Sequence, residues 1–203
     1  MNKKIVTNSL NLVKSYLKAI RHEDFNVSNQ RQFFTLPDFT NKKKVYRRKE
    51  LVGYSMQQMY AVVSDVENYK SFVPYCKKSK LFAKSGNTAK GEIQVGFPPL
   101  RESYTSNLTF NEPNLVKSEC FDGRLFNYLL NHWAFSPGVK DVPDSCVIDF
   151  RVEFEFKSAL HSNLSHLFFD LVVQQMEGAF VAEACRRYGK PKIGSHVLTI
   201  EKS

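Results

Sequence analysis

The chain has 203 residues, enough for one domain with a complete hydrophobic core, and a formal net charge of +9. Residues 1–43 hold eight Lys/Arg and three Asp/Glu, whereas residues 44–190 hold nineteen and sixteen. The basic charge is therefore concentrated at the beginning of the chain, and the remainder lacks the dense basic face that is typical of nucleic-acid-binding proteins.

The first 43 residues are expected to form a leader rather than part of the domain. Residues 1–21 contain five Lys/Arg and no acid, and their apolar residues follow helical spacing. A basic amphipathic start without acids is typical of a mitochondrial transit peptide, although an ordinary surface helix would have the same pattern. Residues 37–43 are polar, and we expect them to be unstructured.

The folded domain is expected over residues 44–190. A strand at 44–54 is followed by a helix at 56–64, for which Ser55 is the expected N-cap, and by a short helical stretch at 65–69. Six further strands are separated by short turns, which predicts an antiparallel sheet. These strands are expected at 77–84, 88–97, 102–110, 115–122, 125–135 and 146–156.

The last strand and the helix after it carry the clearest patterns. Even positions from 146 to 156 are apolar, and odd positions from 149 are charged, which predicts one buried and one solvated face. Residues 158–188 then repeat apolar side chains at helical spacing, with Ser158 as the expected N-cap and Gly189 and Pro191 as stop signals. The sequence therefore predicts an α+β fold in which one long helix covers a sheet of about six or seven strands. Residues 191–203 are expected to be a C-terminal tail.

The sequence contains no recognisable motif for metal binding or for catalysis. His161 and His166 point about 140° apart on a helix, and the four cysteines form no CxxC pair. No run of about eighteen apolar residues occurs, so no membrane-spanning helix is predicted. Asp149, Glu153 and Glu155 share one strand face with Arg151, and we interpret them as a solvated face rather than as acid–base catalysts. The residues therefore provide no candidate catalytic group, no metal site and no sign of a cofactor.

Large apolar side chains are plentiful, with seventeen Phe, nine Tyr and one Trp. Core packing explains most of them. A sheet that encloses a single helix also leaves an elongated apolar space, however, and aromatic residues in loops at its rim suit an apolar ligand. The residues alone thus indicate a domain that could hold an apolar molecule.

Several short motifs resemble one family. They include Val62-Val63-Ser64-Asp65-Val66, Phe72-Val73-Pro74-Tyr75-Cys76, Val95-Gly96-Phe97-Pro98-Pro99-Leu100 and Trp133-Ala134-Phe135-Ser136-Pro137-Gly138. From Val45 to Lys190 the chain resembles the mitochondrial coenzyme Q-binding proteins of the START-like superfamily, which also contains polyketide cyclases and lipid-transport proteins. One departure is Tyr75, where the family usually has Trp.

The resemblance implies a helix-grip START-like fold and non-enzymatic binding of ubiquinone as a ligand in a hydrophobic tunnel. It implies a chaperone-like role that delivers or positions ubiquinone for the respiratory chain and for its own biosynthesis. The implied location is peripheral, on the matrix side of the inner mitochondrial membrane. Implied partners are ubiquinone, this membrane and the complexes of ubiquinone biosynthesis or respiration, with no nucleic acid.

Thirteen residues are expected to contact ubiquinone, because they belong to the matched motifs or to the apolar face of the long helix. They are Phe72, Pro74, Tyr75, Phe97, Pro98, Leu100, Tyr104, Trp133, Leu164, Phe168, Leu171, Val172 and Met176. Beside the expected mouth, Lys77, Lys78 and Lys80 either face anionic lipid or belong to a solvated edge strand.

Two alternatives remain open at this point. A cyclase-type enzyme acting on an aromatic or polyketide-like substrate would need an acid or a base inside the cavity. A ribosome-binding protein, as found among bacterial relatives, would bind RNA with steep salt dependence, and the modest charge of the domain argues against it.

Overall fold

The computed structural model describes residues 43–203 except 98–99, 122, 124–125 and 158. It describes their side chains except at positions 97, 100, 101, 156, 159–172 and 174. Residues 1–42 of the expected leader and the expected helix cap Ser158 lie outside the described residues and stay predictions, whereas Lys43, the last residue assigned to the leader, begins β1.

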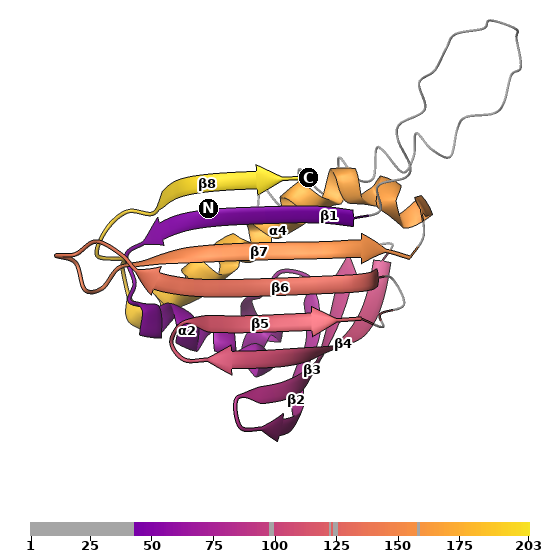
Figure 1. Cartoon of the computed structure of the whole chain (residues 1–203), viewed down its shortest axis with the longest axis horizontal. Coiled ribbons are helices and arrows are strands. Elements are labelled where there is room, and N and C mark those ends of the chain that lie inside the picture. The colour runs from indigo at the N-terminus through magenta and orange to yellow at the C-terminus, as the bar shows by residue number, and fades with distance from the viewer. Residues whose placement is uncertain (1–42, 98–99, 122, 124–125, 158) are drawn as a thin grey trace, which may run out of the picture. The chain divides into compact units, whose positions relative to one another are not determined.

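A single curved antiparallel sheet of eight strands forms most of the domain (Figure 1). The strand order is β2-β3-β4-β5-β6-β7-β1-β8, so β2 and β8 are the two edges. The strands are β1 (Lys43–Val52), β2 (Cys76–Ser85), β3 (Thr88–Phe97), β4 (Leu100–Asn111), β5 (Leu115–Cys120), β6 (Phe126–Pro137), β7 (Cys146–Phe156) and β8 (His196–Lys202).

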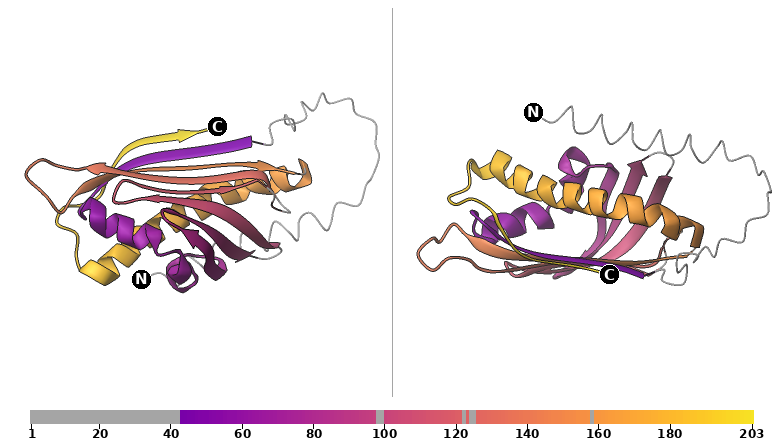
Figure 2. Two further views of the ribbon diagram at one scale, coloured as in Figure 1. Left: turned by 60° about the horizontal axis from the view of Figure 1, so that its bottom comes forward. Right: turned by 90° about the horizontal axis from the view of Figure 1, so that it is seen from above.

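The helices gather on one face of this sheet (Figure 2). They are α2 (Met56–Ser64), the 3-10 turn η1 (Val66–Asn68), α3 (Tyr69–Phe72) and the 30-residue α4 (Ala159–Tyr188). Ser55 caps α2 as predicted: its hydroxyl accepts a hydrogen bond from the Gln58 amide, and the Gln58 side chain accepts one from the Ser55 amide. Gly189 ends α4 with φ +84°, a conformation that glycine adopts without strain.

The alternation predicted for residues 146–156 is confirmed in β7. Cys146, Ile148, Phe150, Val152 and Phe154 are all buried on the face that α4 covers. The charged residues between them face the other way and pair across strands, as in the contact of Arg47 on β1 with Asp149 at 2.6 Å. Asp149, Arg151 and Glu155 of this face are accessible to solvent as the sequence indicates, whereas Glu153 is buried beneath its ion pairs with Lys43 and Arg151.

The predicted α+β helix-grip fold is confirmed, but the sheet has one more strand than expected. Residues 196–202 of the segment interpreted as a tail form β8, which pairs with β1. The preceding chain passes so close to Gly53 that a Cβ there would lie 2.5 Å from the Ile193 carbonyl oxygen, and the Lys192 amide donates to the Gly53 carbonyl. Residues 191–203 therefore belong to the domain. Within the described ranges, none of the helices has the length and apolar character that crossing a bilayer requires.

Candidate functional site

A cavity of about 60 Å³ lies between the sheet, α4 and the segment that joins α2 to β2. Met176 and Phe180 of α4 form one side of it. The other described lining residues come from the joining segment and from β2 to β7: Val66, Tyr69, Val73, Pro74, Cys76, Ile93, Val95, Tyr104, Leu108, Val116, Ser118, Asn131, Trp133 and Phe150. Most of these side chains are apolar, so the cavity suits an apolar molecule.

An aromatic cluster forms the wall next to α4. The Trp133 ring lies 4.2 Å from that of Phe150 and 4.7 Å from that of Phe180, measured between centroids. Phe180 also meets the rings of Tyr69 and Phe72 edge-on, at 5.2 and 5.4 Å. Because these rings come from β6, β7, α3 and α4, the cluster ties the helix to the sheet through interactions of about 0.5–1.5 kcal/mol per pair.

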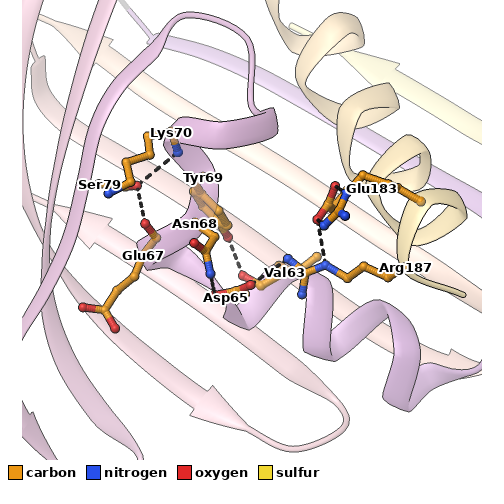
Figure 3. Close-up of polar contacts among 10 residues, drawn as sticks. Val63, Asp65, Glu67, Asn68, Tyr69, Lys70, Ser79, Glu183 and Arg187 are labelled. Atoms are coloured by element: carbon orange, nitrogen blue, oxygen red, sulfur yellow. Dashed lines mark hydrogen bonds and ion pairs between the residues drawn. The ribbon is translucent and has the colours of Figure 1, made fainter.

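The segment of η1 and α3 covers one side of the cavity, and polar contacts fix it at its start and in its middle (Figure 3). At one end, Arg187 of α4 binds Asp65 at 2.6 Å and Glu183 at 2.7 Å. In the middle of the segment, the Ser79 hydroxyl of β2 donates to the Glu67 carbonyl and accepts from the Lys70 amide, both at 3.1 Å. These contacts hold Val66, Tyr69, Val73 and Pro74 against the cavity.

The cavity also contains a few polar groups. Tyr104 of β4, Ser118 of β5 and Asn131 of β6 belong to its lining and are half-buried. Burial raises the pKa of the Tyr104 hydroxyl, so this group stays protonated at neutral pH and can donate a hydrogen bond. A largely apolar cavity with a small number of placed polar groups is the usual form of a ligand site.

A separate ionic cluster lies on the β1 side of α4. Arg48 binds Glu50 at 3.0 Å and Glu177 of α4 at 3.3 Å, and the Tyr46 hydroxyl donates to Glu177 at 3.4 Å. The pKa of Glu177 is raised to about 7: burial is the largest cause and the nearby Glu50 adds to it, while Arg48 and the Tyr46 hydrogen bond oppose the shift. Phe150, the cross-strand neighbour of Arg48, lines the cavity, but none of the four cluster residues does.

Of the residues predicted to contact ubiquinone, the structure brings four to the cavity wall: Pro74, Tyr104, Trp133 and Met176. Phe72 lies just behind the wall against Phe180, and the Tyr75 hydroxyl donates to Gln175 of α4 at 3.1 Å. Pro98 lies outside the described residues, as do the side chains of Phe97, Leu100, Leu164, Phe168, Leu171 and Val172. Contact of these seven residues with ubiquinone therefore stays a prediction.

Sequence reasoning missed several residues of the wall. Phe150 and Phe180 follow the apolar periodicity of their elements, so the pattern that predicted the core could have identified them. Ser118 and Asn131 carried no such signal, because single polar residues in a strand usually face solvent. The register of β5 and β6 pairs Ser118 with Asn131, and each lies two residues from a buried cavity residue on its own strand, Val116 or Trp133. Both therefore face the side of the sheet that α4 covers.

Lys77, Lys78 and Lys80 lie on the edge strand β2 and are exposed. Lys78 binds Glu92 of β3 at 2.9 Å, a surface pair that contributes little to stability. Phe82, on the same strand, is 39% exposed. Within the described residues, no group of three or more His, Cys, Asp or Glu side chains could hold a metal ion.

Comparison with known proteins identifies relatives of this chain. The family model "Polyketide cyclase / dehydrase and lipid transport" matches residues 52–181. The coenzyme Q-binding protein COQ10, mitochondrial, of Drosophila melanogaster is 55% identical over 201 residues, which cover 99% of this chain and 82% of that protein.

Two solved structures share the fold. An 18 kDa protein of Caulobacter crescentus has a TM-score of 0.59 at 26% identity, over 72% of this chain and 99% of that one. The Zhui aromatase/cyclase of a Streptomyces species has a TM-score of 0.60 at 13% identity, over 71% and 95%. The matched residues, the identity and the sheet that encloses one long helix agree: this chain belongs to the COQ10 family of coenzyme Q-binding proteins, within the polyketide cyclase/dehydrase and lipid-transport family.

Proposed function

We propose that this protein binds coenzyme Q between the sheet and α4 and presents it to other proteins without transforming it. The observation that carries the proposal is the apolar cavity with its aromatic wall and few polar groups, in a chain 55% identical to a protein named for coenzyme Q binding. Ubiquinone has the matching chemistry, since it joins an oxygen-bearing ring to a long apolar tail.

The cavity must enlarge to admit this ligand. Its volume of about 60 Å³ is far below the roughly 300–1,000 Å³ of pockets that enclose drug-sized molecules. Met176 is an unbranched side chain that changes rotamer at low cost, so we expect it to be among the first groups to move.

The lining supports binding better than catalysis. Its described titratable residues are Tyr69, Tyr104 and Cys76, and burial raises the pKa of each. All three are therefore neutral near pH 7 and act as hydrogen-bond donors rather than as bases. Glu177, the buried carboxyl nearest in sequence to Met176, faces Arg48 and Tyr46 instead.

The protein purified from bacterial cells that make ubiquinone, without detergent, tests the proposal. We expect organic extraction and mass spectrometry of the full chain to find ubiquinone approaching one equivalent per protein. Phospholipid alone, or no lipid, from protein that circular dichroism shows to be folded would contradict the proposal and favour the enzyme alternative.

We further propose that the protein works in the mitochondrion, as a peripheral protein on the matrix side of the inner membrane. There it would supply ubiquinone to respiratory or biosynthetic complexes. The name of the Drosophila relative supports the organelle. The exposed lysines of β2, next to the exposed Phe82, support contact with an anionic lipid surface through this edge.

Replacing Lys77, Lys78 and Lys80 together by glutamine is expected to weaken binding to phosphatidylcholine vesicles that contain cardiolipin. Each lysine near an anionic surface contributes about 1 kcal/mol, so the triple change predicts a loss of about a hundredfold at low salt. Vesicle sedimentation measures it. The control is the same change at the exposed Lys140, Lys190 and Lys192, which lie outside β2. Equal losses in both variants would mean that the net charge of the protein, and not the β2 edge, determines binding to the vesicles.

A further inference from the structure

Three polar side chains form a patch on the covered face of the sheet, and we call them the polar floor: Ser106 of β4, Ser118 of β5 and Asn131 of β6. Ser118 and Asn131 are direct cross-strand partners. Ser118 also pairs with Leu108, which lies two residues after Ser106 on the same face of β4. Directly opposed side chains have Cβ atoms about 4.5–5.5 Å apart, and diagonal ones are about 7–8 Å apart. Ser118 and Asn131 therefore lie within reach of one small molecule, and Ser106 lies diagonally next to Ser118.

The surroundings of the polar floor are apolar. On the same face, Tyr104 and Leu108 flank Ser106 along β4, Val116 precedes Ser118 along β5, and Trp133 follows Asn131 along β6. All four of these neighbours line the cavity, as do Ser118 and Asn131 themselves. Ser118 and Asn131 are thus polar members of the cavity wall, and Ser106 is buried directly behind the wall between Tyr104 and Leu108.

The hydrogen-bonding capacity of this floor is not used by the described part of the protein. Ser106 is 2% exposed, and its hydroxyl has no hydrogen-bond partner among the described residues. For Ser118 and Asn131, which border the cavity, the described residues likewise provide no side-chain hydrogen bond. Unpaired polar groups in an apolar interior destabilise a fold, whereas residues of the same size without polar atoms would not. The arrangement is explained if a bound molecule supplies the missing partners.

We propose that the polar floor is the subsite for the oxygen-bearing ring of the ligand. This inference rests on the proposed function and adds the orientation of the ligand in the cavity. The Asn131 amide and the Ser118 hydroxyl donate hydrogen bonds to ring oxygens, and the buried Ser106 hydroxyl provides a third donor behind them. The apolar tail then leaves the floor along the side chains of α4 and the aromatic cluster. An oxidised ring accepts these hydrogen bonds, and a reduced ring can also donate one to the Asn131 carbonyl oxygen.

This subsite predicts selectivity for the ring. Decylubiquinone and decylbenzene carry the same tail, but only the first has ring oxygens. An apolar cavity alone would take both, whereas the polar floor favours the quinone. Losing one neutral hydrogen bond in a desolvated site corresponds to a change of about twofold to tenfold in affinity.

The test uses delipidated full-length protein and the fluorescence of Trp133, the single tryptophan of the chain, which lines the cavity. Quenching reports entry of decylubiquinone, and displacement by decylbenzene gives the affinity of the competitor. The variants are Asn131→Leu, which keeps the size of the side chain, and the smaller change Ser118→Ala. The control Asn107→Leu alters an exposed asparagine on the opposite face of β4.

We expect wild-type protein and the control to prefer decylubiquinone, and each floor variant to lose about twofold to tenfold in quinone affinity with decylbenzene affinity unchanged. Thermal stability of the ligand-free Asn131→Leu variant should not fall, because it removes an unpaired polar group. Wild-type protein without a preference for the quinone, or variants that lose both ligands equally, would overturn the subsite and leave coenzyme Q binding standing. Folded wild-type protein that binds neither ligand would overturn both proposals.

Discussion

Replacing Ile93 by tryptophan is expected to reduce the ubiquinone that copurifies with the protein by at least about tenfold. Ile93 lines the cavity from β3 and faces Tyr104 across the strand pair. A larger ring at this position occupies the space that the ligand needs. Overpacking a filled core costs about 1–3 kcal/mol, but here the new ring enters existing space, so we expect the fold to survive.

The neighbouring residue provides the matched control for this experiment. Gln94 follows Ile93 on β3 and points to the opposite face of the sheet, so Gln94→Trp adds the same ring outside the cavity. Mass spectrometry of organic extracts should find ubiquinone with Gln94→Trp and little with Ile93→Trp, while circular dichroism shows both folded. Normal ubiquinone content in folded Ile93→Trp would place the ligand elsewhere on the protein.

The fold could be predicted from the sequence wherever burial leaves a regular pattern. The charged and apolar alternation of β7 identified its buried face, and helical spacing located α4 to within one residue of its observed start at Ala159. The strand β8 lacks such a pattern, because all its residues are exposed and Val197, Leu198 and Ile200 point to both faces. Its position depends on the close approach of the chain to Gly53, which no local pattern reveals.

The cavity could be predicted only in part, for a related reason. Pro74 and Trp133 belong to motifs that resemble one family, and the structure places both on the wall. The contribution of Ser118 and Asn131 arises from the register between β5 and β6, a relation between residues thirteen positions apart. Likewise, the pKa of Glu177 is raised by its burial against β1 and by Glu50 of that strand, and lowered by Arg48 of the same strand, far away in the sequence. Tertiary pairing decides these properties, and periodicity carries no information about it.

The second large effect is expected from Glu177→Gln, which should stabilise the protein at neutral pH. Two buried carboxyl groups, Glu50 and Glu177, share the guanidinium of Arg48, so one negative charge lacks full compensation. Burial therefore raises the pKa of Glu177 from 4.5 to about 7. Below pH 4.5 the folded and unfolded states both hold the proton. As the pH rises from 4.5 through 7, the unfolded state releases it first, and stability is lost over this window.

At about 1.36 kcal/mol per pKa unit, this loss amounts to roughly 3 kcal/mol above pH 7. Glutamine resembles the protonated carboxyl and does not titrate, so the variant should not lose these roughly 3 kcal/mol as the pH rises. The gain over wild type is reduced by the attraction between Arg48 and the Glu177 carboxylate, which the variant lacks. Urea denaturation of both proteins between pH 5 and 8 measures the difference. Burial lowers the pKa of His132, which has the opposite effect on stability, but His132 contributes equally to both proteins and its effect cancels in the comparison.

Glu183, six residues further along α4, is the matched control because it is also buried but has two cationic partners. Hydrogen bonds from Arg186 and Arg187 lower its pKa to about 2, although burial opposes the shift. Its stabilisation is present above pH 4.5 and is lost as the pH falls toward 2, the reverse of Glu177. Glu183→Gln should therefore destabilise the protein at pH 7, by about 1–2 kcal/mol after allowance for the solvent exposure of Arg186. Two buried glutamates on one helix should thus respond to the same substitution with opposite signs. If Glu177→Gln also destabilises at pH 7, Arg48 compensates both carboxylates and the cluster is an ordinary buried salt bridge.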